Sequence, residues 1–363
     1  MSQNDPLLEV DNICKTFDEK VGNVVDQVRF SIYNNEIFAL LGPSGCGKTT
    51  TLRIISGLEK CESGTVQLEG NIISSPGLDV PPEKRGIGLV FQEYALFPHL
   101  SVLQNVIFGL KSFPKLQREE KAVELLCMMG LRDYQHRSPH ELSGGQQQRV
   151  SLARAIAPMP KIIMLDEPFS NLDAVLRQST RNEVRSLLKK AGMSALLVTH
   201  DQEEALSFAD RIAVMNEGRI EQIGTPEEVY YRPKTPFVAQ FLGKTNLITA
   251  EADGEYAATD FGTVKLDRPA HGKVLLSIRP EHLTLVNADE QTPLSESGEV
   301  VSKDFKGHDI TYRVRIRTRE CLVHTDNLLN VEAGDRVIVS PLEKAVVLED
   351  IGQPAEVPAY QDI

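Results

Sequence analysis

Residues 37–49 read IFALLGPSGCGKT, and within them residues 42–49 match the pattern GxxxxGK[ST]. A short apolar run precedes the glycines, and a helical pattern follows over residues 50–56. Glycines let the main chain fold so that its N–H groups converge on a phosphate, and the helix behind adds the partial positive charge of its N-terminus. The segment therefore predicts a strand, a phosphate-binding loop and a helix, which together begin an α/β nucleotide-binding domain.

The glycine loop assigns roles to two polar side chains, but it does not identify the class of protein. Lys48 is expected to reach the β- and γ-phosphates, and the Thr49 hydroxyl to bind Mg²⁺. GTPases, motors, kinases and transporters all remain open at this point. Cys46 lies inside the loop, where we interpret it as a small side chain that the turn tolerates.

A second, acidic signal ends an apolar strand-like run. Residues 162–167 read IIMLDE and close with Asp166 and Glu167. Carboxylates at the carboxyl end of a parallel strand lie at the sheet edge where nucleotides bind. Asp166 is expected to hold Mg²⁺, directly or through water, and Glu167 to polarise the attacking water as general base. The same pair in isolation could be a solvated turn, but its place after the phosphate loop favours catalysis.

Short apolar runs alternate with helical patterns over residues 1–242, as in a layered α/β domain. The strand pattern fades between residues 92 and 160, where 117–129 and 146–157 read as helices, so we expect a helical subdomain there. Residues 243–363 contain short segments rich in Val and Ile between turn residues. This pattern predicts a small all-β domain of the barrel or sandwich type.

Residues 142–146 read LSGGQ, and a helical pattern follows them. A serine and two glycines at a helix start form an anion-binding turn, although the same residues also make an ordinary N-cap. One chain needs only one such turn for one γ-phosphate. A second turn is useful if it serves a nucleotide that another copy of the chain holds.

Together these motifs resemble those of the ABC transporter ATPases. LSGGQ is similar to the family signature, and the LDEP run that contains Asp166 is similar to its second nucleotide motif. Gln92, in VFQEYALFPHL, resembles the glutamine that contacts Mg²⁺ and senses the permease. Residues 170–173, SNLD, resemble the D-loop, and His200 resembles the switch histidine that contacts the γ-phosphate. Phe17 resembles the aromatic that stacks on adenine, although a phenylalanine there could also belong to the core.

The resemblance implies a homodimer in which each ATP, with its Mg²⁺, lies between one phosphate loop and the opposite LSGGQ. The residues that it implies for catalysis are Glu167, His200 and Gln92. Those that it implies for nucleotide binding are Phe17, Gly42, Pro43, Ser44, Gly45, Cys46, Gly47, Lys48, Thr49 and Thr50. Those that it implies for contact with the partner's nucleotide are Ser143, Gly144, Gly145, Gln146 and Asp173. The implied Mg²⁺ ligands are Thr49, Gln92 and Asp166.

Composition limits the partners. The chain has 51 acidic and 39 basic residues, and its net charge of −12 argues against nucleic-acid binding. No stretch reaches the roughly 18 consecutive apolar residues of a membrane helix, and the first residues lack a signal-peptide pattern. The five cysteines contain no CxxC pair, which favours a reducing cytoplasm over a disulfide framework or a zinc site. The resemblance implies two transmembrane permease subunits, an indirect periplasmic solute-binding protein, and a place at the cytoplasmic face of the inner membrane.

The tail and two internal segments suggest the direction and the cargo of transport. Residues 277–285 and 298–316 resemble the small TOBE/OB-like β domain of ATPases in binding-protein-dependent importers. Residues 80–102 and 140–158 look most like the ferric-iron importers. Polyamine import is the alternative, followed by sugar, sulfate or phosphonate import. Residues 93–100, EYALFPHL, are unusually apolar for a loop and are either local core or a dock for a permease helix.

Two other classes fit the sequence less well. A GTPase would need an NKxD-type guanine reader, which this chain does not contain. A DNA-associated ATPase should show a basic face and long helical arms, whereas this chain is acidic and its helical insertion is short.

Overall fold

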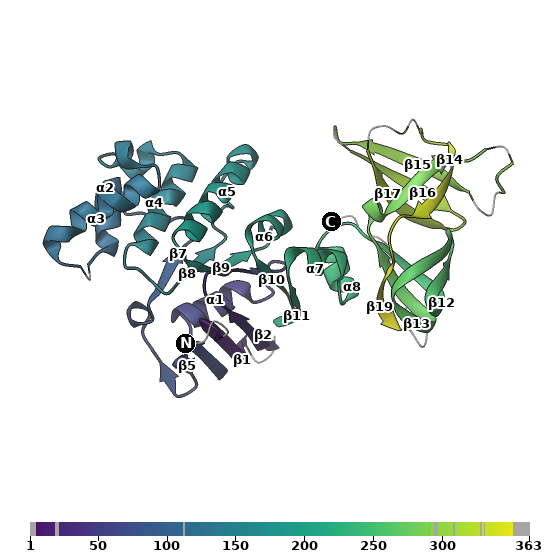
Figure 1. Ribbon diagram of the computed structural model, residues 1–363. Coiled ribbons are helices and arrows are strands. Elements are labelled where there is room, and N and C mark those ends of the chain that lie inside the picture. Colours follow the sequence, from purple (N-terminus) through teal and green to yellow (C-terminus); the bar gives the residue numbers. More distant parts are fainter. Residues whose placement is uncertain are drawn as a thin grey trace. The chain divides into compact units, whose positions relative to one another are not determined.

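A computed structural model describes residues 5–18, 22–111, 113–289, 291–293, 297–307, 309–326, 329 and 331–350. The chain divides into two compact units, Met1–Pro226 and Glu227–Ile363 (Figure 1). None of the helices within the described ranges has both the length and the apolar character that crossing a membrane requires.

The first unit contains a six-stranded sheet in the order β11-β10-β3-β9-β8-β7. Its strands are β3 (Ile37–Leu41), β7 (Ile87–Val90), β8 (Ile162–Asp166), β9 (Ser194–Thr199), β10 (Arg211–Asn216) and β11 (Arg219–Gly224). All neighbours are parallel except β10 and β11, which form an antiparallel pair. Every residue of β3 and β9 is buried, because apolar side chains occupy both faces of these central strands. The register pairs Leu41 with Thr199 and Asp166 with Val198, so three strands end at one edge of the sheet.

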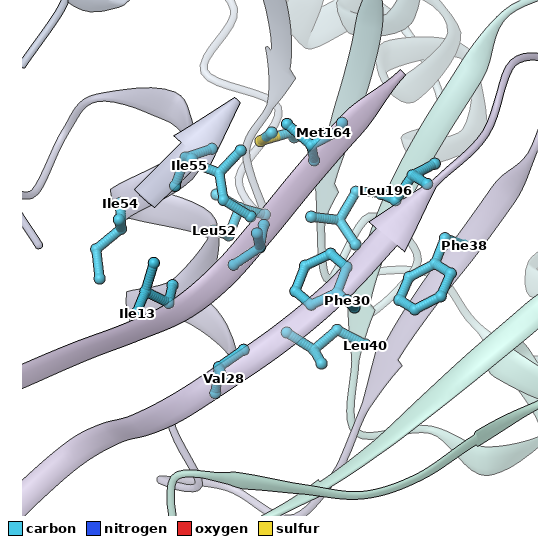
Figure 2. Close-up of a cluster of buried hydrophobic side chains, with 14 of the residues drawn as sticks. Ile13, Val28, Phe30, Phe38, Leu40, Leu52, Ile54, Ile55, Met164 and Leu196 are labelled. Carbon is cyan, nitrogen blue, oxygen red and sulfur yellow. The ribbon is translucent and has the colours of Figure 1, made fainter. Parts of the chain in front are cut away.

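A second, antiparallel sheet in the order β2-β1-β4-β5-β6 belongs to the same unit. Its strands are β1 (Leu8–Asp18), β2 (Gly22–Ile32), β4 (Ser63–Leu68), β5 (Asn71–Ser75) and β6 (Leu78–Asp79). One hydrophobic core joins both sheets with helix α1 (Lys48–Ser56) (Figure 2). Phe30 and Phe38 stack across it with ring centroids 5.1 Å apart. Because the phosphate loop connects β3 to α1, this packing holds both ends of the loop in place.

The chain between β7 and β8 forms helices, as the sequence predicts. The α-helices of the unit beyond α1 are α2 (Val102–Gly109), α3 (Lys115–Met128), α4 (Gly144–Ile156), α5 (Ala174–Lys190) and α6 (Gln202–Phe208). Short 3-10 turns lie at Pro82–Lys84, Arg132–Tyr134 and Pro139–Glu141. α2 packs closely on α4 because Gly109 has no side chain: a Cβ there would lie 2.5 Å from the carbonyl oxygen of Arg154.

The second unit is mainly β, which confirms the predicted change of character. Its strands are β12 (Asn246–Thr259), β13 (Gly262–Ile278), β14 (Leu283–Asn287), β15 (Gly298–Phe305), β16 (Ile310–Ile316), β17 (Arg319–Thr325), β18 (Arg336–Pro341) and β19 (Val346–Asp350). They form one sheet in the order β12-β13-β19 and another in the order β14-β18-β15-β16-β17. Both sheets contribute to one apolar core, in which the Tyr312 side chain is fully buried. The helical elements are α7 (Pro226–Tyr231), α8 (Pro236–Phe241) and the 3-10 turn Pro280–His282.

The buried side chain of Arg279 joins α7 and α8 to this β unit. Its guanidinium donates to the carbonyl oxygens of Tyr230 at 2.9 and 3.1 Å, Ala239 at 2.8 Å and Gly243 at 3.1 Å. Tyr230 in turn donates its hydroxyl to Glu281 at 2.9 Å. These contacts explain why the compact unit begins at Glu227. The extent of the ATPase domain along the sequence, residues 1–242, remains a prediction.

Candidate active site

The phosphate loop, residues 42–49, depends on close approach between main-chain segments. A Cβ at Gly42 would lie 2.1 Å from the carbonyl oxygen of Met215, and one at Gly47 would lie 2.3 Å from that of Val24. Gly47 also has a φ of +103°, and Gly45 a φ of +83°, which side-chain-bearing residues rarely adopt. The glycines are therefore needed for the shape of the loop.

Helix α1 begins directly at this loop, with Gly47 as N-cap and no side-chain cap. The first N–H groups of a helix have no partner within it, so this end favours an anion. Lys48 is only 5% exposed, and its ammonium donates to the carbonyl oxygens of Gly42 and Pro43 at 2.8 Å each. The loop thus holds a positive charge beside uncapped donors, an arrangement that suits phosphate.

Cys46 is buried in the loop and fixes it to a neighbouring turn. Its carbonyl oxygen accepts from the N–H of Gly218 at 3.1 Å. Burial raises the pKa of the Cys46 thiol, although the nearby Lys48 ammonium works in the opposite direction. The thiol is therefore protonated at neutral pH. Contact between the Cys46 main chain and the nucleotide remains a prediction.

The carboxyl end of β8 brings four predicted residues together. The Thr49 hydroxyl lies beside the Asp166 carboxyl. Burial, and then the charge of Glu167, raise the pKa of the Asp166 carboxyl. The Glu167 carboxylate lies 3.0 Å from Nδ1 of His200. A hydroxyl and a carboxylate oxygen are ligands that Mg²⁺ prefers, so the donor set fits this ion.

The main chain positions Glu167 in an uncommon conformation. Its φ is +44°, and its N–H donates to the carbonyl oxygen of Val198 at 2.9 Å. The hydroxyl of Ser170 donates to the Glu167 carbonyl oxygen at 2.9 Å. These bonds hold a left-handed residue in place, and such strain is often found where a side chain must point into an active site.

Gln92 follows β7, and the segment after it is fastened to α4. Tyr94 and Ala95 have φ values of +58° and +47°. The carbonyl oxygen of Tyr94 accepts from the Ser151 hydroxyl and from Arg154, both at 2.9 Å, and that of Ala95 accepts from Arg154 at 2.7 Å. A movement of this loop would therefore be transmitted directly to α4.

The signature turn, residues 142–146, starts α4 with a complete capping box. The Ser143 hydroxyl accepts from the N–H of Gln146 at 3.4 Å, and the Gln146 side chain accepts from the N–H of Ser143 at 2.9 Å. A Cβ at Gly144 would lie 2.9 Å from a methyl carbon of Leu172, and one at Gly145 would lie 3.0 Å from the Thr180 hydroxyl. The ordinary N-cap is therefore present, and anion binding by this turn remains a prediction.

Family models and known relatives match most of this chain. The family model for ABC transporters matches residues 25–170, and the model for the TOBE domain matches residues 276–348. The Fe(3+) ions import ATP-binding protein FbpC 2 of Pectobacterium atrosepticum is 41% identical over 316 residues, which cover 86% of this chain and 90% of that protein. The chain belongs to the ABC transporter ATPases. The spermidine/putrescine import ATP-binding protein PotA 1 of Pseudomonas aeruginosa is 45% identical over 318 residues, which cover 83% of this chain and 84% of that protein.

A solved structure agrees with this assignment. The ATP-binding cassette MJ0796, in a dimeric post-hydrolysis state with ADP and Pi, matches with a TM-score of 0.52 and 32% identity over 60% of this chain and 98% of its own. The predicted fold, an ABC-type α/β domain followed by a small β domain, is confirmed. The chain is an ATP-binding enzyme that hydrolyses ATP.

In this ABC ATPase, the D-loop adjoins the signature turn of the same chain. Leu172 lies against Gly144, and Asp173 caps α5 by accepting from the N–H of Leu176 at 3.0 Å. The Asn171 amide donates to the carbonyl oxygen of Gln92 at 2.9 Å. The D-loop therefore contacts both the glutamine segment and the signature turn, and the role of Asp173 toward a partner's nucleotide remains a prediction.

Phe17, the predicted adenine-stacking residue, lies near the end of β1 with 60% of its surface exposed. The core interpretation of this residue is therefore wrong. The Lys15 ammonium lies 5.2 Å from the centre of the ring. An exposed ring of this kind leaves a face free for a base.

Two residues of the site have no counterpart among the sequence predictions. They are Ser151 and Arg154, which hold the main chain of the glutamine segment. Both lie in SLARA, after the signature, but no local pattern indicates that this run contacts residues almost 60 positions earlier. Only the packing of α4 against the end of β7 brings these segments together.

Proposed function

We propose that this ABC ATPase drives the import of a solute and that Glu167 is its general base. The observation that carries the catalytic assignment is the arrangement at the end of β8. The Thr49 hydroxyl lies beside the Asp166 carboxyl, and the adjacent Glu167 contacts His200. Oxygen ligands for a cation and a carboxylate for a water thus lie side by side, next to the phosphate loop.

Each side chain then has a defined part in hydrolysis. The main-chain N–H groups of the phosphate loop and Lys48 bind the phosphates, and Thr49, Asp166 and Gln92 would hold Mg²⁺. When bound, that ion neutralises charge on the phosphate oxygens. Glu167 accepts the proton of the attacking water, and His200 orients the Glu167 carboxylate and reaches toward the γ-phosphate. Phe17 stacks on adenine.

The second half of each site comes from another copy of the chain. In this proposal Ser143, Gly144, Gly145, Gln146 and Asp173 face the nucleotide of the partner subunit. Support comes from the signature turn, which presents a serine and a helix N-terminus at a place remote in sequence from the phosphate loop. The similar cassette MJ0796 was solved as a dimer. Closure on ATP and reopening after hydrolysis would turn chemistry into movement.

We further propose that Phe97, His99 and Phe108 form the surface that docks a permease subunit. The ring of Phe97 lies 4.5 Å from that of Phe108 and 6.0 Å from that of His99, and 41% of the surface of Phe108 is exposed. Tyr94, by contrast, is buried, so the segment 93–100 is partly core and partly surface. The surface follows Gln92 directly, and α4 holds the connecting main chain.

Substitution of Glu167 by Gln tests the catalytic assignment. Glu167→Gln keeps the shape of the side chain but removes the base, so we expect steady-state hydrolysis to fall at least about a hundredfold. ATP binding should be retained, and size-exclusion chromatography with ATP should show a stable dimer. Glu203→Gln, at an exposed glutamate of α6, is the matched control and should hydrolyse ATP normally. Normal turnover by Glu167→Gln would exclude Glu167 as the base. If Glu167→Gln bound ATP but stayed monomeric, the proposed ATP-bound dimer would be contradicted.

For the cargo we propose iron(III), with the polyamines spermidine and putrescine as the alternative and sugar, sulfate or phosphonate after them. Iron is favoured by the similarity of residues 80–102 and 140–158 to ferric-iron importers. The relative named for iron import and the relative named for polyamine import have similar sequence identity to this chain, 41% and 45%. The complete transporter would combine two ATPase chains, two permease subunits and a periplasmic binding protein at the inner membrane.

A deletion strain separates the two main cargoes. Loss of the chain should reduce uptake of radiolabelled iron(III), and growth should fail on limiting iron while spermidine uptake stays at the parental level. Reduced spermidine uptake with normal iron uptake would favour the polyamine alternative. The Lys48→Ala variant, expressed in the deletion strain, should fail to restore uptake of the cargo, whereas the unaltered chain should restore it.

A further inference from the structure

His200 lies on a short connection between β9 and α6, and about half of its side chain, 51%, is exposed. An exposed imidazole can adopt several rotamers, so its contact with the Glu167 carboxylate at 3.0 Å depends on how the neighbouring main chain is held. The residues on either side of His200, Thr199 and Asp201, supply that restraint together with Glu204.

These three residues form a closed ring of hydrogen bonds around His200 in the sequence. The Thr199 hydroxyl donates to a carboxyl oxygen of Glu204 at 2.5 Å and accepts from the N–H of Asp201 at 3.0 Å. The Asp201 carboxylate, as the N-cap of α6, accepts from the N–H of Glu204 at 3.0 Å. Each residue of the ring contacts the other two, so the main chain is fixed directly before and directly after His200.

The same stretch of chain also fixes Glu167. The N–H of Glu167 donates to the carbonyl oxygen of Val198 at 2.9 Å, and its carboxylate contacts Nδ1 of His200. Residues 198–201 thus hold the main chain of Glu167 and carry the side chain that contacts its carboxylate. A displacement of this stretch would change the geometry between the two groups.

The fold alone does not explain a carboxyl group at position 204. Glu204 is 3% exposed and Thr199 is 1% exposed. Within the part of the chain that the structure describes, Oε1 of Glu204 has no hydrogen-bond partner. A buried polar atom without a partner destabilises a protein, and an apolar side chain of the same length would avoid this cost. The start of α6 does not need the carboxyl group either, because Asp201 already caps the helix.

The surroundings of Glu204 also favour its neutral form. Burial raises the pKa of the Glu204 carboxyl to about 7, and the charges of Asp201 and Glu167 act in the same direction. The hydrogen bond from Thr199 and the charge of Arg181 oppose this rise. A large fraction of Glu204 is therefore neutral at pH 7. Glutamine, which is neutral and has the same shape, can accept from the Thr199 hydroxyl in its place.

We propose that Glu204 and Thr199 are positioning residues that hold His200 in place for hydrolysis. This inference rests on the role proposed above for His200. Both side chains are buried, so they act through the connection between β9 and α6 and not on the nucleotide. Because a misplacement of about 1 Å can lower a rate about a hundredfold, loss of the pair should slow hydrolysis and leave ATP binding intact.

A paired apolar substitution tests this role in the full chain. Thr199→Val combined with Glu204→Met replaces both partners by apolar side chains of similar shape, so neither member of the pair is left without the other. We expect kcat for ATP hydrolysis to fall at least about tenfold. The affinity for ATP, measured by nucleotide titration, should change less than about threefold. The thermal midpoint should stay within about 4 °C of that of the unaltered chain.

Two single variants are the controls. Glu204→Gln keeps an acceptor for the Thr199 hydroxyl and should retain a kcat within about threefold of that of the unaltered chain. Glu203→Met makes the same change to methionine one position earlier in α6, at a side chain that is 74% exposed, and should hydrolyse ATP normally.

Three results would overturn the proposal. The first is a normal kcat in the double variant. The second is a kcat that falls in Glu204→Gln as far as in the double variant, because the hydrogen bond to Thr199 would then not be what matters. The third is an equal loss of kcat and ATP affinity, or unfolding of both the double variant and Glu204→Met alone, because the pair would then serve only the fold. If the double variant alone fails to fold, Glu204→Met is measured with the same expectations.

His200→Ala separates this inference from the proposed function. Normal hydrolysis by His200→Ala would contradict the proposed role of His200 itself. Impaired hydrolysis by His200→Ala together with a normal kcat in the double variant would contradict only the positioning role of Glu204 and Thr199.

Discussion

The phosphate loop and the signature turn are both glycine-rich and both lead into a helix, but they treat the helix N-terminus differently. Before α1 the N-cap is Gly47, in a left-handed conformation and without a side-chain cap. Before α4 the N-cap is Ser143, in an extended conformation, and a capping box already uses the N–H of Gln146. The first helix start is open to an anion, whereas the second is satisfied within its own chain. A nucleotide at the second would have to compete with, or add to, an existing cap.

The two segments also require glycine for different physical reasons. At Gly47 the main chain itself requires glycine, because φ is positive and the carbonyl oxygen of Val24 is too close for a side chain. At Gly144 the obstacle is a methyl carbon of Leu172, which is the movable end of a flexible side chain. The phosphate loop is therefore rigid by construction, and the signature turn has room to adjust.

The largest expected effect comes from removing the charge of the phosphate loop. Lys48→Ala deletes the ammonium that lies beside the uncapped N–H groups of α1, and it should reduce ATP binding below detection and hydrolysis at least about a thousandfold. Nucleotide titration and a phosphate-release assay would measure both. Lys60→Ala, at an exposed lysine after α1, is the control. Unchanged ATP affinity of Lys48→Ala would remove this loop from the nucleotide site.

A pair of glycine substitutions should separate rigidity from adjustable packing. Gly47→Ala should lower the free energy of unfolding of the first unit by about 3 kcal/mol, because strain and a main-chain clash combine. Gly144→Ala should change it by no more than about 1 kcal/mol, because alanine favours the helix and Leu172 can move. Thermal unfolding of the full chain, followed by circular dichroism, measures the difference. Equal destabilisation by the two substitutions would contradict the contrast between the segments.

The smallest expected effect tests whether the cap of the signature turn has a second use. Ser143→Ala should destabilise α4 by about 1 kcal/mol and leave ATP binding by the monomer unchanged. Ser101→Ala is a close control, because Ser101 and Gln104 form the same capping box at the start of α2. Both variants should lose similar stability, but only Ser143→Ala should reduce steady-state hydrolysis, by about tenfold. An equal loss of hydrolysis in both would mean that Ser143 acts only as a cap.

Local patterns were sufficient for a large part of the fold and for the elements of the candidate site. The run 37–41 is apolar on both faces because β3 is a central parallel strand, and the positions of Asp166 and His200 at strand ends follow from the same sheet. The helix that starts at Lys48 and the one that starts at Gly144 were predicted because turn residues mark their N-termini. The sequence leaves Phe17 either as an adenine-stacking residue or as part of the core, and only its exposure in the structure rules out the core.

The sequence by itself determined the order of the elements, the chemistry of the phosphate loop and the membership of the family, because these depend on residues that are neighbours in the chain. The tertiary structure alone decided that Arg154 holds the main chain after Gln92 and that Arg279 fastens α7 and α8 to the β unit. In each case the arginine binds groups from other elements, mostly main-chain carbonyl oxygens. A carbonyl oxygen is present at every residue and leaves no trace in the sequence, so only the packing of distant segments shows which ones an arginine will bind.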